Sequence, residues 1–173
     1  GDLNGTTVEN PDNINMDRAN CGFDYRHIIN TIVVAETHFH LTGLAAKLIN
    51  NWEIAPLMRI TDGTPFTMYT GLDQSLTDIN NDRPNQVSSK VYTGNKILSI
   101  FSPSSVYING SAFAINATGT YGNVGRNSLR GPKYFELDSA ISRFIPLHDG
   151  VMLDLRLEAF NALNHPDFSP PTY

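Results

Sequence analysis

The chain has 173 residues, a length that suits one domain, and charged residues make up 17 % of it, against the roughly 25 % usual in soluble globular proteins. Its formal net charge at pH 7 is −5 and its Lys and Arg residues are scattered, which excludes nucleic acid as the main partner because phosphate binding needs a basic face. No stretch approaches the ~18 apolar residues of a transmembrane helix. This criterion does not apply to the strands of a membrane barrel, which are short and alternate in polarity.

The first quarter of the sequence changes from turn-forming to strand-forming composition. Residues 1–25 are rich in Asn, Asp and Gly and predict an irregular N-terminal arm. Residues 26–39 are rich in β-branched residues and predict a strand with apolar groups on both faces, as in a strand that is covered on both sides. The single cysteine, Cys21, lies in the arm and has no partner for an internal disulfide.

The middle of the sequence predicts short elements separated by loops. Residues 41–50 predict one short helix, and residues 52–61 predict a strand in which Pro56 indicates a sheet edge or a bulge. Asp62-Gly63 predicts a tight turn or a bulge before a further strand segment at 65–70. Residues 71–90 predict a long polar loop, residues 91–100 and 106–115 predict two short strands, and the glycines of 116–133 predict repeated turns.

The last third of the sequence has the most regular alternation. Residues 134–144 and 151–160 predict two strands of a β-hairpin, with the turn at Pro146, Asp149 and Gly150. In the second strand one face is wholly apolar and the other carries the charges. The apolar face has Val151, Leu153, Leu155, Leu157 and Ala159, and the other face has Met152, Asp154, Arg156 and Glu158. Residues 161–173 predict an irregular, Pro-rich tail.

These patterns predict an all-β fold, namely a single β-barrel-type domain over residues 1–173. We expect an antiparallel meander of about five to seven strands from a barrel wall, with long loops and at most one short helix. A wall in lipid needs an apolar outer face, because Arg or Lys at the bilayer midplane costs roughly 2–4 kcal/mol, whereas the inner face tolerates charge. A soluble β-sandwich with the same leucines in its core has the same periodicity and remains an alternative.

The charged row Asp154, Arg156 and Glu158 is the candidate lumen-facing site, with a cation between two anions and about 7 Å along the strand from one charge to the next. It suits either the lining of a substrate path or an ion-pair ladder that stabilises the wall. No Ser/His/Asp, Cys/His or paired-carboxylate constellation stands out, so we expect no enzyme activity and no cofactor.

Two loops rich in Asp and Asn are candidate sites for structural Ca²⁺, which takes 6–8 oxygen ligands. One contains Asp12 and Asp17, and the other contains Asp78 and Asp82. Neither has the Gly and Glu positions of an EF-hand loop, so a plain loop is the alternative for both.

Several short stretches, in order, resemble the C-terminal β-barrel region of TonB-dependent receptor-like outer-membrane proteins, the carboxypeptidase-regulatory-domain-bearing kind found in Acidobacteria. The stretches are Phe23–His27, Trp52, Gly63–Thr67, Asp82–Asn85, Gly119–Asn127, Arg130–Pro132, Leu137–Ser139, Arg156–Asn161 and Asn164–Phe168. Together they span residues 23–168.

The resemblance implies an outer-membrane β-barrel that, in whole family members, works with a periplasmic plug and an energy-coupling partner to import a bulky nutrient. The sequence contains neither the plug nor the coupling segment, and it ends soon after Asn164-His165-Pro166, so we expect a slice of a larger barrel in the bacterial outer membrane. Its expected partners are the remainder of that barrel and outer-membrane lipid. The alternative is a secreted extracellular subunit that pairs its open strand edges with copies of itself to form a filament or tube.

Overall fold

The computed structural model describes residues 8–78, 81–94 and 107–170. The chain forms two compact units. The sheet unit comprises His27–Thr61 and Lys133–Asp167, and the loop unit comprises Gly1–Arg26, Asp62–Pro132 and Phe168–Tyr173. Each is described by itself, and the expected single domain stays a prediction.

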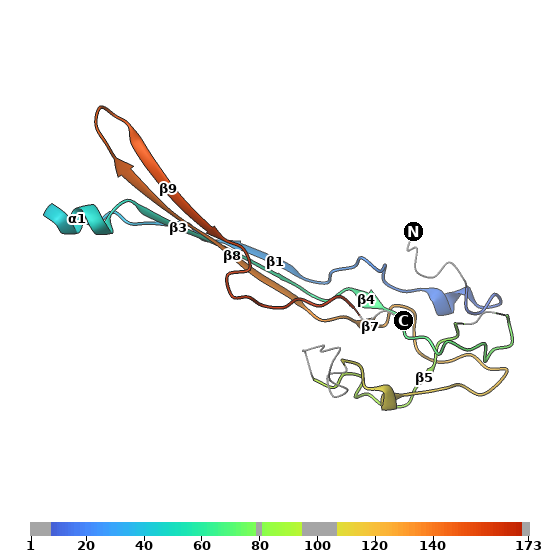
Figure 1. Cartoon of the computed structure of the whole chain (residues 1–173). Coiled ribbons are helices and arrows are strands. Elements are labelled where there is room, and N and C mark those ends of the chain that lie inside the picture. The colour runs from blue at the N-terminus through green and yellow to red at the C-terminus, as the bar shows by residue number, and fades with distance from the viewer. Residues whose placement is uncertain (1–7, 79–80, 95–106, 171–173) are drawn as a thin grey trace. The chain divides into compact units, whose positions relative to one another are not determined.

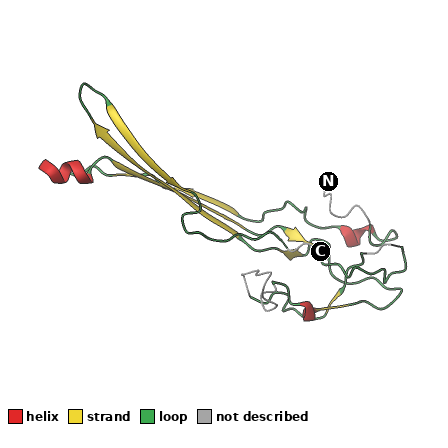
Figure 2. Ribbon diagram, in the orientation of Figure 1, coloured by secondary structure: helices red, strands yellow, loops and turns green. Residues whose placement is uncertain are grey.

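The sheet unit is an antiparallel meander of long strands (Figures 1 and 2). The strands are β1 (Ile28–Ile32), β2 (Ala35–Glu36), β3 (Trp52–Thr61), β8 (Tyr134–Pro146) and β9 (Met152–Ala159). They lie in the order β1-β3-β8-β9, and β2 also pairs with β3. The expected antiparallel, mostly-β fold with one short α-helix is therefore confirmed.

The strand expected over residues 26–39 is divided into β1 and β2 by a break at residues 33–34. The two pieces keep one register on β3, from Ile28 opposite Thr61 to Glu36 opposite Glu53. Pro56 lies at the break, where its carbonyl accepts a hydrogen bond from the Val33 N–H at 3.1 Å but its ring nitrogen has no hydrogen to donate in return. The prediction that Pro56 marks an edge or a bulge was wrong, because β3 has neighbours on both sides and the break in the adjacent strand accommodates the proline.

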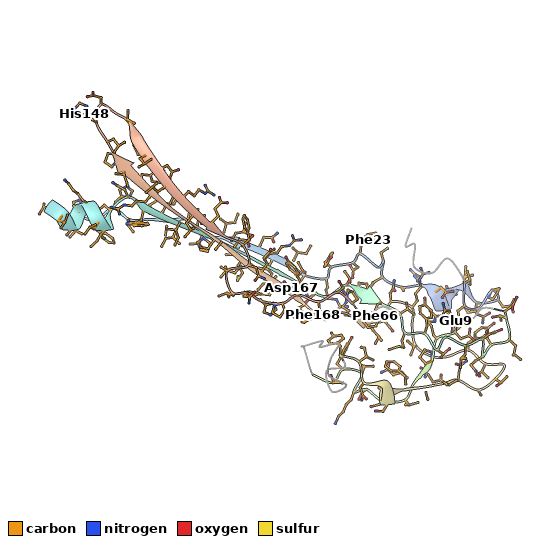
Figure 3. All side chains as sticks on the ribbon, viewed as in Figure 1. Glu9, Phe23, Phe66, His148, Asp167 and Phe168 are labelled. Atoms are coloured by element: carbon orange, nitrogen blue, oxygen red, sulfur yellow. The ribbon has the colours of Figure 1, made fainter. Side chains whose placement is uncertain are left out.

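The predicted hairpin and the predicted helix are both confirmed. Strand β8 pairs with β9 from Ser139 opposite Ala159 to Pro146 opposite Met152, so Pro146 ends the strand and does not lie in the turn. The turn consists of residues 148–150, where Gly150 has a φ of 79° that suits glycine. His148 marks its tip in Figure 3. Helix α1 (Gly43–Ile49) lies at the same end of the sheet as this turn (Figure 1).

Where the loop unit is described, its elements are short. They are the 3₁₀ helices η1 (Ile14–Asp17) and η2 (Gly110–Ala112), and the two-residue strands β4 (Pro65–Phe66), β5 (Asn85–Gln86), β6 (Phe113–Ala114) and β7 (Leu129–Arg130). Strand β4 pairs with β7, and β5 pairs with β6. Two short strands were expected at 91–100 and 106–115, and residues 95–106 of them lie outside the described residues. The described remainder contains an isolated Tyr92–Ile108 bridge, η2 and β6.

Glycine allows two backbone segments of the loop unit to approach closely. A Cβ on Gly63 would collide with the carbonyl of Gly131, and one on Gly122 would collide with the carbonyl of Arg83. The expected turn or bulge at Asp62-Gly63 is therefore a close backbone contact between the segments that hold β4 and β7.

Among the described residues, the buried apolar side chains all belong to the loop unit. They are Ile108, Ala112, Val124 and Leu129. In the sheet unit every residue of β1 and β9 is exposed, which corrects the expectation of a strand covered on both sides. The described helices include none that is long and apolar enough to cross a membrane. The sheet therefore leaves its large apolar side chains uncovered within the chain.

Candidate functional site

The register of the sheet sorts its side chains into two faces, because residues directly opposite each other in antiparallel strands point to the same side. Leu155 lies opposite Arg143, which lies opposite Trp52. Arg156 lies opposite Ser142, which lies opposite Glu53. Following these rows across the sheet assigns each strand residue to one face, and we name the two faces by their composition.

The apolar face carries almost only hydrocarbon and aromatic side chains. It consists of Ile29, Thr31, Ala35, Trp52, Ile54, Pro56, Met58, Ile60, Phe135, Leu137, Ser139, Ile141, Arg143, Ile145, Leu153, Leu155, Leu157 and Ala159. Arg143 is the one charged residue of the apolar face within these strands, and it lies in the row nearest α1. Leu157 is 71 % exposed and Leu155 is 53 % exposed, so the face is uncovered.

The charged face carries the remaining charges of the sheet. It consists of Ile28, Asn30, Ile32, Glu36, Glu53, Ala55, Leu57, Arg59, Thr61, Tyr134, Glu136, Asp138, Ala140, Ser142, Phe144, Pro146, Met152, Asp154, Arg156 and Glu158. Acidic residues outnumber basic ones, and all five strands contribute to the face. The apolar and charged division predicted for one strand thus extends across the whole sheet.

The predicted row Asp154, Arg156 and Glu158 lies on the charged face of β9. The Nε of Arg156 is 2.7 Å from the Oε1 of Glu158, so these two side chains form an ion pair, while Asp154 lies opposite Phe144. Both members of the pair are about half exposed, and such pairs contribute little to stability. Their role as the lining of a substrate path stays a prediction.

Sequence reasoning missed the charged residues of β3 on this face. Glu53 and Arg59 belong to it, and Arg59 lies 5.7 Å from the ring centroid of Tyr134. The signal was present as odd-and-even alternation in residues 52–61, but large apolar residues on both faces obscured it. Only the pairing of β3 with β8 shows that the odd-numbered residues of β3 share a face with the even-numbered residues of β8.

A cavity of about 340 Å³ lies at the α1 end of the sheet. Its lining combines the carboxylates of Glu36 and Glu53, which lie opposite each other, with the rings of Trp52 and Phe144. His38 also lines it, with its Nδ1 3.9 Å from the Glu36 carboxylate. Carboxylates beside aromatic rings are a combination that accepts organic cations.

The loop unit buries a charged cluster around Arg83, which is 2 % exposed. Arg83 forms an ion pair with Glu9 through Nε, and its Nη1 lies 3.1 Å from the Oδ1 of Asp17. Burial raises the pKa of Glu9 above its usual 4.5, although the nearby charge of Arg83 and its backbone N–H oppose the shift. This cluster joins the N-terminal arm to the loop at residue 83, and Figure 3 labels Glu9 within it.

The four aspartates of the candidate Ca²⁺ loops do not share one environment. Asp17 binds Arg83 and accepts the Glu9 N–H at 3.0 Å, whereas Asp12 is exposed. Asp82 is fully buried and accepts the backbone N–H and hydroxyl of Ser75 at 2.6 and 3.0 Å. The part of the chain that the structure describes has no group of three or more His, Cys, Asp or Glu side chains arranged to hold a metal ion. Calcium binding stays a prediction.

Asp73 organises the loop that contains Asp78. Its carboxylate accepts the backbone N–H groups of Thr77 and Asp78 at 3.0 and 2.8 Å. Burial alone would raise the pKa of Asp73, but these hydrogen bonds hold it below its usual value. The loop is thus arranged by a side chain that sequence reasoning did not single out.

Several of the stretches that carried the family resemblance contact one another in the loop unit. The Arg130 Nη2 lies 2.5 Å from the Asp24 Oδ2, and Nη1 donates to the Gly63 and Asp24 carbonyls, both at 3.1 Å. The hydroxyl of Thr67 donates to the Asn127 Oδ1 at 3.0 Å. Cys21 is exposed as a free thiol. These contacts hold loops together and leave the sheet faces as the candidate functional surfaces.

Comparison with known proteins agrees with the two-faced sheet. Residues 1–173, the whole chain, match the family described as Outer membrane beta barrel domain. Comparison with curated proteins and with solved structures returned no match. Since the family match covers every residue, the chain belongs to the outer membrane beta barrel domain family, and its place is the bacterial outer membrane.

Proposed function

We propose that the chain forms part of the wall of a TonB-dependent receptor-like transporter, with its apolar face against lipid and its charged face toward the solute path. The family match supports the barrel, and the ordered resemblance over residues 23–168 supports the receptor type. The observation that carries the proposal is the division of the sheet, in which one face holds a single charge, Arg143, and the other holds all the remaining strand charges.

The dimensions of the apolar face fit this role. From Trp52 to Ile60 along β3 the face is about 27 Å long at ~3.4 Å per residue, against an apolar band roughly 25 Å tall on outer-membrane barrels. A strand tilted as barrel strands are would therefore cross most of the band. Trp52 ends the apolar face at one side and Phe135 ends it at the other, as aromatic girdles do.

The connections of the sheet give the wall an orientation. The β8–β9 turn is short, and the segment from β2 to β3 that contains α1 lies at the same end. The connection from Thr61 to Tyr134, which starts and finishes at the opposite end, is far longer. Because outer-membrane barrels have short periplasmic turns and long extracellular loops, the α1 end faces the periplasm under this proposal.

Transport energised through a coupling partner is tested by the accessibility of the charged face in native outer membranes. In a Cys21→Ser background, Arg156→Cys is labelled with a small membrane-impermeant maleimide before and after an uncoupler removes the proton-motive force. A TonB-dependent transporter predicts that the labelling rate at residue 156 changes with energisation. The matched position Leu76→Cys, in the loop unit and 69 % exposed, should label at one rate throughout. Equal rates at residue 156 in both states would contradict the coupling.

A second candidate is the self-assembling extracellular subunit, which one observation favours. Among the described residues, β9 pairs with β8 alone and β1 pairs with β3 alone, so both outer strands present unpaired backbone groups. Such edges are costly in lipid and bind further strands. Negative-stain microscopy of the purified chain without detergent separates the two: ordered fibres support the subunit, whereas aggregation that detergent reverses supports the barrel wall.

A further inference from the structure

Helix α1 is an apolar helix with no protein cover. Lys47 is its one charged residue, none of its residues is buried, and Leu44 and Leu48 are 73 % and 56 % exposed. A helix this short is not stable alone in water, because even isolated helices of about 12–15 residues have only marginal stability. Its apolar surface therefore needs cover from its surroundings.

Side chains at the end of the apolar face hold the C-terminus of α1. The Trp52 Nε1 donates to the Leu48 carbonyl at 2.9 Å, the Thr37 hydroxyl donates to the Ile49 carbonyl at 2.8 Å, and Arg143 donates to the Lys47 carbonyl. These carbonyls belong to the last turn of the helix, where carbonyl oxygens have no backbone N–H donor within the helix. Since Trp52 and Arg143 form the last full row of the apolar face, α1 continues that face at the α1 end of the sheet.

Arg143 indicates at what depth this row lies. Its guanidinium carbon lies 4.9 Å from the centroid of the Trp52 ring, and its Nε is buried without a hydrogen-bond acceptor among the described residues. A lipid-facing Arg costs roughly 2–4 kcal/mol at the bilayer midplane but only about 0–1 near the interface. Tryptophan is likewise enriched at the interface. The row therefore fits the headgroup layer.

We propose that α1 and the row Thr37, Trp52 and Arg143 form an anchor in the headgroup layer of the periplasmic leaflet, where Arg143 and Lys47 bind phospholipid phosphates. The inference rests on the proposed wall role. Two observations select lipid as the occupant. The surface of α1 is continuous with the apolar face, and two cations, Lys47 of α1 and Arg143 beside it, complement phosphate.

The sole tryptophan, Trp52, is a probe within the proposed anchor. The full chain is reconstituted into phosphatidylcholine vesicles that contain lipids brominated either near the glycerol or near the chain ends. The anchor predicts that Trp52 fluorescence is quenched strongly by the shallow bromines and weakly by the deep ones. Leu44→Asp should abolish the shallow quenching, whereas Leu76→Asp, at an equally exposed position of the loop unit, should leave it unchanged.

Replacement of the cations tests phosphate binding. In vesicles with added phosphatidylglycerol, Lys47→Gln should lower the preference for the anionic lipid about fivefold. Arg143→Gln should do the same, and Arg143→Lys should restore the preference. Arg59→Gln is the matched control, because Arg59 also lies over an aromatic ring but on the charged face. The Lys47 side chain has no ion-pair partner among the described residues, so Lys47→Gln should fold normally. An unchanged lipid preference in Lys47→Gln would overturn phosphate binding.

A fluorophore on Ala159→Cys, in the Cys21→Ser chain, separates this inference from the wall role, because Ala159 lies in the row of Ser139 and Pro56, midway along the apolar face. If the label at residue 159 is quenched by deep bromines while Trp52 is open to aqueous iodide, the anchor is overturned and the wall stands. If neither site meets bromine, both the wall and the anchor are overturned. Trp52 quenching that is strongest with deep bromines would also contradict the anchor.

Discussion

At the scale of single residues, Arg83 shows how the loop unit compensates for its small apolar core. Its side chain is 2 % exposed, and it bridges Glu9 and Asp17, which come from a distant part of the chain. Removing one member of such a cluster leaves charges buried without compensation, which is more damaging than losing a surface pair. The cluster therefore ties the N-terminal arm to the Asp82–Asn85 stretch.

Arg83→Ala should lower the unfolding free energy of the loop unit by about 3–5 kcal/mol, because Glu9 and Asp17 lose their shared cation. Pulse proteolysis in urea, followed at cleavage sites in the loop unit, measures the change. Arg18→Ala removes an exposed arginine from the same unit and should change the value by no more than about 0.5 kcal/mol. Equal effects of the two substitutions would contradict the role of the cluster.

Glu9 makes the stability of the loop unit depend on pH in a defined direction. Because burial raises its pKa in the folded state, the folded chain binds the proton more tightly than the unfolded chain. This contribution is fully present below pH 4.5 and is lost as the pH rises through the folded pKa. The unfolding free energy of the native chain minus that of Glu9→Gln should therefore fall between pH 4.5 and neutrality. A difference that rises with pH would show the opposite shift.

At the scale of elements, the sheet accommodates Pro56 at the cost of one ladder hydrogen bond. Its ring nitrogen faces the β1–β2 break, while the pairing of β3 with β8 continues past it to Thr61 opposite Tyr134. In antiparallel strands the N–H and C=O of one residue point to the same neighbour, so the proline affects only the side of β1 and β2. This confinement explains how a proline lies inside the sheet.

Pro56→Val should supply the missing donor and join β1 to β2. The new N–H faces Val33, and a net gain of about 0.5–1.5 kcal/mol is expected for one hydrogen bond. Hydrogen exchange should show the amide at residue 56 protected to the level of its neighbours in β3. Ala55→Val, which changes no donor, is the control. Rapid exchange at residue 56 would mean that the break persists for another reason.

Sequence patterns predicted the elements that depend on local alternation. The β8–β9 hairpin, α1 and the span of β3 were predicted, since their periodicity and turn residues are local. The break at residues 33–34 was not, because it depends on Pro56 of a neighbouring strand. Nor were the Arg83 cluster and the Arg130–Asp24 pair, whose partners lie far apart in the sequence and leave no periodic signal.

The charged row of the candidate site was predicted for β9, and the charges that β3 adds to it were missed. The alternation in Val151–Ala159 is clean, so its two faces follow from the sequence. The position of Arg143 on the apolar face follows only from register, because residues 134–144 place both polar and apolar groups on each side. The role of Trp52 likewise depends on α1, which the sequence does not place against the sheet.

At the scale of the whole molecule, the two units bury very different amounts of apolar surface. The loop unit holds the small core, while the sheet exposes apolar side chains on one face and charges on the other. A sheet with a large uncovered apolar face is not stable in water, because the exposed apolar surface contributes no hydrophobic free energy to folding. Under the proposed wall role, the lipid of the outer membrane covers this face, in agreement with the family to which the chain belongs.

Site-directed labelling along two paired strands tests this account most directly. In a Cys21→Ser chain folded in lipid bilayers, single cysteines are placed along β9 at 153–158 and along β3 at 54–59 and treated with a water-soluble maleimide. The account predicts that even positions label in β9 and odd positions label in β3, because their register inverts the parity. Residues 155 and 157, and 54 and 58, should stay unlabelled. Labelling of both parities in either strand, or the same parity in both, would contradict the lipid-facing wall.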